Sequence, residues 1–91
     1  MMFRVTYHRL VVRDDIPKLS REWKKQIQRA IEDRLMTSPD LYGKPLRRSL
    51  KGYRKLRVGD YRVIFKIEKN RLKILVIQHR SGAYAEAEKR A

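Results

Sequence analysis

The 91-residue chain contains no cysteine. This absence excludes a disulfide framework, a thiol nucleophile and a cysteine-ligated metal site. The sequence also lacks the apolar stretch of about 7–15 residues found in signal peptides and the roughly 20 apolar residues of a membrane span. We therefore expect a cytoplasmic protein without a membrane partner.

Acidic residues are few relative to basic ones. Asp and Glu number 10 against 24 Lys and Arg, which gives a formal net charge of +14 and an isoelectric point near 10.7. A charge of this size and sign is typical of proteins that meet nucleic acid or an acidic protein. A chain of this length is expected to form a single domain, over residues 1–91, with a modest core.

Three runs in the C-terminal half alternate between apolar and polar residues, namely Tyr53–Val58, Tyr61–Ile67 and Leu72–Arg80. Successive side chains of a strand point to opposite faces, so each run predicts one apolar face and one polar face. The apolar set is Leu56, Val58, Tyr61, Val63, Phe65, Ile67, Leu72, Ile74 and Val76. The opposite set is Lys55, Arg57, Arg62, Lys66, Lys73 and His79. A sheet face that basic indicates an anionic partner, although any one of these cations alone is more simply a solvated surface residue.

Two short links fix the pairing of these strands. Gly59-Asp60 and Lys69-Asn70 predict two-residue hairpin turns, and hence a three-stranded antiparallel meander. In that register Arg57 lies opposite Arg62, and Lys66 lies opposite Lys73. Like-charge pairs of this kind cost from a few tenths to about 1 kcal/mol each. A bound polyanion would relieve the repulsion.

The N-terminal half carries helix signals. Phe3–Tyr7 alternates as a short strand, and a brief helix is expected over residues 9–16, ended by Pro17 because proline lacks a backbone donor. Ser20 is a good N-cap for a longer helix that we expect Pro39 to close. The apolar stripe of that helix has the helical period and comprises Trp23, Ile27, Ala30, Ile31 and Leu35.

The remaining segments have weaker patterns. Thr37–Lys51 contains two prolines and a glycine and is expected to be a connection whose Leu46 and Leu50 reach the core. A short turn or helix is expected over Ser81–Arg90. The predicted fold is therefore α+β, with the order β-α-α-β-β-β-(α), a mainly antiparallel sheet and helices packed on one face.

The other face is expected to be the open cationic one. Ile64, Leu75 and Ile77 are expected on it among the cations. Such apolar positions could dock either a partner helix or a C-terminal turn of the chain itself.

The run from Leu50 to Phe65, LKGYRKLRVGDYRVIF, is followed after a hairpin by HRSGAY at residues 79–84. Together with the GKPL loop at residues 43–46, these motifs closely resemble the RelE/ParE superfamily of toxin–antitoxin toxins. The resemblance covers nearly the entire chain. It implies the RelE/ParE-like fold and a cognate acidic antitoxin that wraps the basic surface, with no metal and no small-molecule cofactor.

Two branches of that superfamily differ in activity. RelE-like members cleave mRNA in the ribosomal A site, whereas ParE-like members poison DNA gyrase. RelE-like nucleases keep a tyrosine shortly after an Arg- or His-bearing strand end, and His79, Arg80 and Tyr84 stand in that place. The resemblance therefore favours a ribosome-dependent mRNA endoribonuclease, whose partners are the ribosome and mRNA.

Metal-independent RNA cleavage needs a base for the ribose 2′-hydroxyl, cations for the extra negative charge and an acid for the leaving 5′-oxygen. The resemblance implies proton transfer for Lys55, phosphate binding for Arg62 and substrate orientation or stacking for Tyr84. The RelE pattern has a second lysine where this chain has Tyr53, so that role is either lost or moved to His79.

Arg80 is a candidate leaving-group acid or phosphate contact, although the spacing also allows Gln78 in its place. The further expected RNA or phosphate contacts are Lys51, Arg54, Arg57, Lys66 and Lys73. Two other functions stay open on the sequence, a non-enzymatic gyrase inhibitor and an RNA- or ribosome-binding module without chemistry. Structural roles also stay open: Arg62 could be an ion-paired surface residue, Tyr84 a packing anchor and His79 a strand-end residue bonded to backbone.

Overall fold

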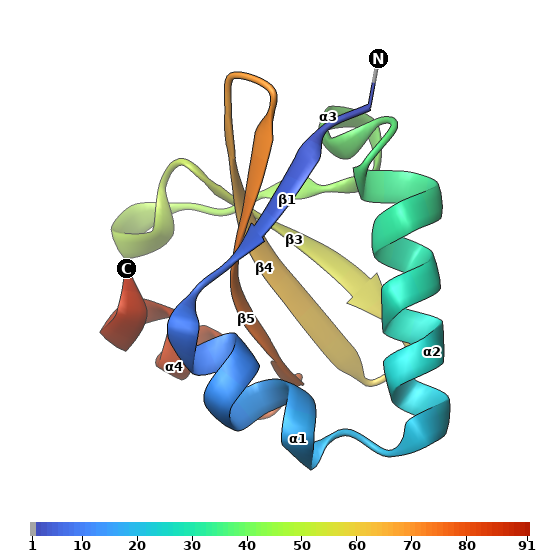
Figure 1. The fold of residues 1–91 in the computed structure, drawn as a ribbon. Coiled ribbons are helices and arrows are strands. Elements are labelled where there is room, and N and C mark those ends of the chain that lie inside the picture. Colours follow the sequence, from blue (N-terminus) through green and yellow to red (C-terminus); the bar gives the residue numbers. More distant parts are fainter. Residues whose placement is uncertain (1) are drawn as a thin grey trace.

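The computed structural model describes residues 2–91. Its five-stranded sheet has the order β1-β5-β4-β3-β2 (Figure 1). The strands are β1 (Arg4–Tyr7), β2 (Lys44–Pro45), β3 (Tyr53–Val58), β4 (Tyr61–Glu68) and β5 (Arg71–His79). Only β1 runs parallel to its neighbour, β5, so the prediction of an α+β fold with a mainly antiparallel sheet is confirmed.

The helices are α1 (Ile16–Lys18), α2 (Arg21–Ala30), α3 (Pro39–Tyr42) and α4 (Ala83–Arg90). π-helical turns precede α1 at Val11–Asp15 and extend α2 at Ile31–Leu35, and a 3₁₀ turn lies at Arg48–Leu50. Within residues 2–91, no helix combines the length and the apolar character that crossing a bilayer requires.

Helix α2 begins where its sequence predicts. The Ser20 hydroxyl accepts a hydrogen bond from the Trp23 N–H at 3.2 Å, which caps the first turn. Ile27, Ile31 and Leu35 are buried against the sheet (Figure 1). The helix stops at Leu35 rather than at Pro39, which instead begins α3, where a missing N–H costs nothing.

The first helix does not end at Ile16 as expected. It continues through Pro17 to Lys18, because the π turn at Val11–Asp15 runs directly into α1, and Pro17 is the second residue of α1.

The turn between β3 and β4 is held against α2. Gly59 has a φ of +58°, and a Cβ on it would lie 2.5 Å from the Trp23 ring. Trp23 also packs on Tyr61, with ring centroids 4.7 Å apart. Glycine is therefore required here for both backbone conformation and close approach.

A β-bulge divides β5. Phe65 pairs with Ile74 but Ile64 pairs with Val76, so Leu75 is an extra residue. Because side chains alternate, one extra residue exchanges the faces of everything after it. Val76 therefore packs in a second core and Ile77 in the first, the reverse of the expectation.

That second core lies on the face expected to be open. Leu50, Ile64, Leu75, Val76, Ala83 and Ala87 are its buried members, and Leu46 packs at its edge. The small side chains of Ala83 and Ala87 let α4 approach the sheet closely. The cationic face is therefore only partly open, and of the two occupants expected for its apolar positions the structure shows the chain's own C-terminal segment, as helix α4.

A buried ion pair joins α4 to the edge of β5. The Asp15 carboxylate accepts hydrogen bonds from the Ile77 N–H at 2.9 Å and from the Gln78 amide at 2.9 Å. Arg90 donates to the same carboxylate at 2.8 and 3.0 Å and to the Leu75 carbonyl at 3.0 Å. The Arg90 and Asp15 side chains are only 3% and 0% exposed. The pair therefore provides hydrogen-bond partners for backbone groups of β5, the Leu75 carbonyl and the Ile77 N–H, that lie beyond the end of β1.

We expect Asp15→Ala to destabilise the fold by about 3 kcal/mol, because it leaves the buried Arg90 with Glu86 as its remaining ion-pair partner and leaves the buried Ile77 N–H without its acceptor. Urea unfolding followed by circular dichroism measures this loss. Asp14→Ala is the matched control, since Asp14 bonds only the exposed side chain of Arg13 and its loss should change stability little. Equal effects of the two substitutions would contradict this role for Asp15.

The same pair predicts a dependence of stability on pH. Burial raises the pKa of Asp15, but hydrogen bonds from Arg90, Gln78 and the Ile77 N–H outweigh it, and the pKa lies below its ordinary value. The stabilisation is then complete above the unfolded pKa of about 3.9 and is lost as the pH falls through the lower folded value. The difference in unfolding free energy between the wild type and Asp15→Asn should therefore narrow below about pH 4. A difference in unfolding free energy that stays constant down to pH 2 would contradict the proposed stabilisation by ionised Asp15.

Candidate nucleic-acid interface

The side of the sheet that carries α4 also carries five cations, which we call the cationic face. Its members are Lys55, Arg57, Arg62, Lys66 and Lys73. Arg57 lies directly opposite Arg62, and Lys66 directly opposite Lys73, as the hairpin turns predicted. Lys55 and Arg57 are two residues apart on β3 and so share this face.

Helix α4 brings Tyr84 to the cationic face. The Lys55 Nζ lies 5.7 Å from the centre of the Tyr84 ring, at a cation–π distance. Both side chains are half-buried, and Tyr84 packs at the margin of the second core. Two residues that are 29 positions apart thus become neighbours.

Arg62 is fixed by backbone rather than by an acid. Its Nη1 donates to the carbonyls of Gly59 at 3.0 Å and Tyr61 at 2.9 Å. Among residues 2–91, Arg62 has no ion-pair partner, since Glu86 binds Arg90 and Glu88 accepts from Ser49. The guanidinium therefore stands beside the β3–β4 turn without a carboxylate against it in the described residues.

Arg80 lies close to the same turn. Its backbone N–H donates to the Asp60 carbonyl at 2.8 Å, and its side chain is exposed. The turn after β5 and the turn after β3 are therefore in contact, which brings the backbone of Arg80 near the turn that anchors Arg62.

His79 does not join this group. It pairs with Tyr61 and stacks edge-on against that ring at 5.9 Å, on the α2 side of the sheet. Its Nδ1 lies 2.9 Å from the Ser81 hydroxyl and accepts from the Ser81 N–H. The expectation that His79 shares a face with Lys55 is wrong, because the bulge at Leu75 reverses the alternation of β5.

Gln78, rather than His79, lies on the cationic face at this end of β5, where it pairs with Arg62. Its amide donates to the buried Asp15, so its role is to connect the sheet with the first helix. The buried Asp15–Arg90 pair itself had no sequence signal, because its members are 75 residues apart.

The other residues predicted to contact phosphate do not all lie on the cationic face. Arg54 points to the α2 side, opposite Phe65, and donates to the Gly43 carbonyl at 2.8 Å. Lys51 is exposed in the turn before β3. Lys66 and Lys73 lie at the far end of the cationic face, where both contact Glu68. In the part of the chain from residue 2 onward, no three His, Asp or Glu side chains gather as metal ligands.

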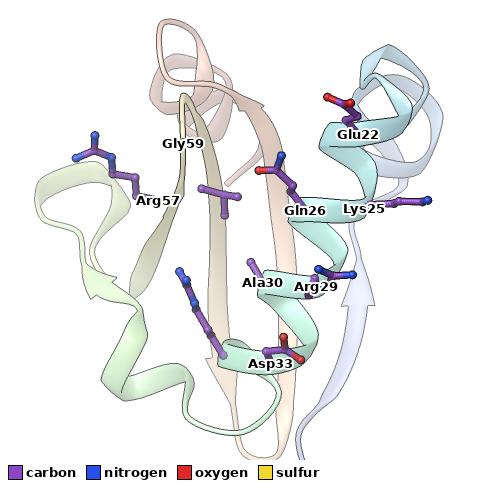
Figure 2. A pocket seen from close by; sticks show the side chains of 10 residues that line it. Glu22, Lys25, Gln26, Arg29, Ala30, Asp33, Arg57 and Gly59 are labelled. Atoms are coloured by element: carbon purple, nitrogen blue, oxygen red, sulfur yellow. The ribbon is translucent and has the colours of Figure 1, made fainter.

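A groove of about 650 Å³ lies between α2 and the end of β3. It exists because β2 covers only Arg54 and Lys55, so the backbone edge of β3 beyond them has no strand neighbour in the described residues. Figure 2 shows Gln26 and Ala30 facing β3 across the groove and Arg57 pointing away from α2. No pattern in the sequence indicates this groove, because the length of β2 decides it.

Comparisons with known proteins agree with this architecture. The relative described as Toxin RelE, from Mycobacterium tuberculosis strain ATCC 25618 / H37Rv, is 42% identical over 52 residues, which span 55% of this chain and 54% of that protein. The chain therefore matches about half the length of that curated relative.

Solved structures extend the match. The toxin–antitoxin complex RelBE2 from Mycobacterium tuberculosis has a chain that matches with a TM-score of 0.80 and 29% identity, over 88% of this chain and 100% of that one. YafQ from E. coli strain BL21(DE3) matches with a TM-score of 0.58 and 23% identity, over 88% and 96%, and shares the fold.

The family model described as "ParE toxin of type II toxin-antitoxin system, parDE" matches residues 4–84. This span includes all five strands, α2 and the first two residues of α4, Ala83 and Tyr84. The chain therefore belongs to the ParE toxin family of type II toxin–antitoxin systems, within the RelE/ParE superfamily.

Proposed function

We propose that this toxin is an endoribonuclease that cuts mRNA on the ribosome and thereby inhibits translation. The observation that carries the proposal is the placement of Lys55 beside Tyr84, on the same sheet face as Arg57 and Arg62. These groups match the parts of a nucleotide. The aromatic ring can stack on a base, the lysine amine can reach the ribose hydroxyl, and the two guanidinium groups can bind the phosphate.

In the proposed reaction, the 2′-hydroxyl oxygen attacks the adjacent phosphorus and the bond to the 5′-oxygen breaks. The neutral amine form of Lys55 takes the proton of the hydroxyl and becomes an ammonium, and Arg57 and Arg62 stabilise the negative charge that develops on the phosphate. Arg80 is assigned to the protonation of the leaving oxygen. Tyr84 stacks on a base next to the scissile bond.

A ribosomal substrate fits the shape of this site. The cationic face is open on the sheet surface, so the protein by itself offers few contacts to hold a flexible strand in the geometry for in-line attack. Orientation accounts for a large part of many rate enhancements. We therefore assign part of the positioning to the ribosome and propose mRNA in its decoding site as the substrate.

We also propose a cognate acidic antitoxin as partner. The similar RelBE2 chain is part of a toxin–antitoxin complex. On this chain the groove beside β3 offers a strand edge without a neighbour in the described residues. Its wall carries four cations, Lys25, Arg29, Arg34 and Arg57, against two carboxylates, Glu22 and Asp33, so its net charge is positive. An extended acidic segment could pair with such an edge through backbone hydrogen bonds.

A second candidate function is inhibition of DNA gyrase on the same fold. It is favoured by the name of the matching family, which is that of ParE toxins. In that case the cationic face would bind protein or DNA, and Tyr84 would only pack against the second core.

We expect Arg62→Ala and Tyr84→Ala each to slow cutting of a translated message by at least about tenfold, because each removes a group that contacts the reacting nucleotides. Primer extension on mRNA from a cell-free translation reaction locates and quantifies the cuts. Arg21→Ala is the control, since this exposed arginine at the start of α2 lies away from the cationic face and should leave the rate unchanged.

Tyr84→Phe separates stacking from packing, because it keeps the ring and should retain most of the cutting. If both Arg62→Ala and Tyr84→Ala cut the translated message at the wild-type rate, the assignment of the cleavage site to the cationic face is wrong. Inhibition of gyrase supercoiling without any cut in translated RNA would instead support the gyrase alternative.

A further inference from the structure

A small cavity lies at the far end of the cationic face, near the β4–β5 hairpin. Its volume is about 250 Å³, and Tyr53, Lys66, Lys73 and His8 are among its lining residues. Neither the proposed chemistry nor the antitoxin groove uses Tyr53 or this cavity.

Three of these residues form a row across the sheet. Tyr53 pairs with Lys66, and Lys66 pairs with Lys73, so their side chains stand next to one another on β3, β4 and β5. The Lys66 Nζ lies 5.6 Å from the centre of the Tyr53 ring. This repeats the Lys55–Tyr84 arrangement at a second place on the same face.

A carboxylate of the same chain, that of Glu68, lies between the two lysine amines. Glu68 reaches Lys73 at 2.9 Å through Oε1 and Lys66 at 3.4 Å through Oε2. The hydrogen bond and charge of Lys73, with a smaller contribution from Lys66, lower the pKa of Glu68. An ionised carboxylate bridging two ammonium groups stands where the oxygens of a phosphate would fit.

The row is continuous with the proposed cleavage site. Tyr53 and Lys55 are two residues apart on one strand, so they share a face and are separated by about 7 Å along it. A strand of RNA whose base stacks on Tyr84 beside Lys55 therefore passes Tyr53 next.

We propose that Tyr53, Lys66 and Lys73 form a second nucleotide subsite, in which Tyr53 stacks on a base and the two lysines bind a phosphate that displaces Glu68. The inference rests on the proposed RNA substrate and adds to it a site for a neighbouring nucleotide. An acidic peptide could also pair with the lysines, but it would gain little from the aromatic ring, which favours single-stranded nucleic acid.

The test measures binding of a short 2′-O-methyl RNA, which cannot be cut by 2′-hydroxyl attack, using fluorescence anisotropy at fixed low salt. Tyr53→Leu should weaken binding by about tenfold, and Tyr53→Phe should bind like the wild type. Glu68→Gln should tighten binding several-fold, because it removes the competing carboxylate and leaves both lysines in place.

Asp14→Asn is the matched control for Glu68→Gln. It removes the same charge from an exposed site on the first helix, so it reports the effect of net charge alone. A Glu68→Gln variant that binds no tighter than Asp14→Asn overturns the proposal. Wild-type affinity in a folded Tyr53→Leu variant also overturns it, and if the leucine variant does not fold, the comparison of Glu68→Gln with Asp14→Asn decides the proposal.

A polyglutamate peptide distinguishes the two anion classes. If Glu68→Gln tightens the peptide and the RNA equally and Tyr53→Leu affects neither, the site takes acidic protein and the RNA assignment is wrong. The binding assay is independent of cutting, so loss of the subsite and loss of the proposed nuclease activity are separate results.

Discussion

The buried pair of Asp15 and Arg90 is the interaction on which the arrangement of this toxin depends. Burying two charges costs several kcal/mol unless their hydrogen-bonding capacity is filled. Here the carboxylate is bonded by a guanidinium, an amide side chain and a backbone N–H, and Arg90 also reaches the Leu75 carbonyl. The first helix, β5 and α4 are thereby fixed to one another, and α4 in turn places Tyr84 beside Lys55.

The two like-charge pairs of the cationic face, Arg57–Arg62 and Lys66–Lys73, have different surroundings. At one end of the cationic face, Arg62 bonds to backbone carbonyls and stays uncompensated opposite Arg57. At the other end, Glu68 bridges Lys66 and Lys73. The repulsion between Arg57 and Arg62 is therefore left for an anionic ligand to relieve, and an anion that displaced Glu68 would take over its bridge between Lys66 and Lys73. This is the electrostatic basis for treating the whole face as one interface.

The register of the cationic face could be predicted because hairpin turns are local. Two-residue links set Arg57 against Arg62 and Lys66 against Lys73 without reference to the rest of the chain. The prediction for His79 was wrong because a bulge depends on packing of both sheet faces, which no local pattern reports. Leu75 and Val76 are consecutive, yet both pack towards α4. The side chains after them therefore lie on the opposite faces from those that strict alternation predicts.

The sequence by itself determined the strands, the capped helix and the high positive charge, because these follow from alternation, side-chain capping and composition. Tertiary structure alone decided which face each end of β5 presents, where α4 lies and that Asp15 is buried. Those outcomes depend on contacts between residues far apart in the chain, such as Asp15 with Arg90 and Lys55 with Tyr84. No periodicity within one segment encodes a partner in another, so the candidate site took its form only when the sheet and its last helix packed together.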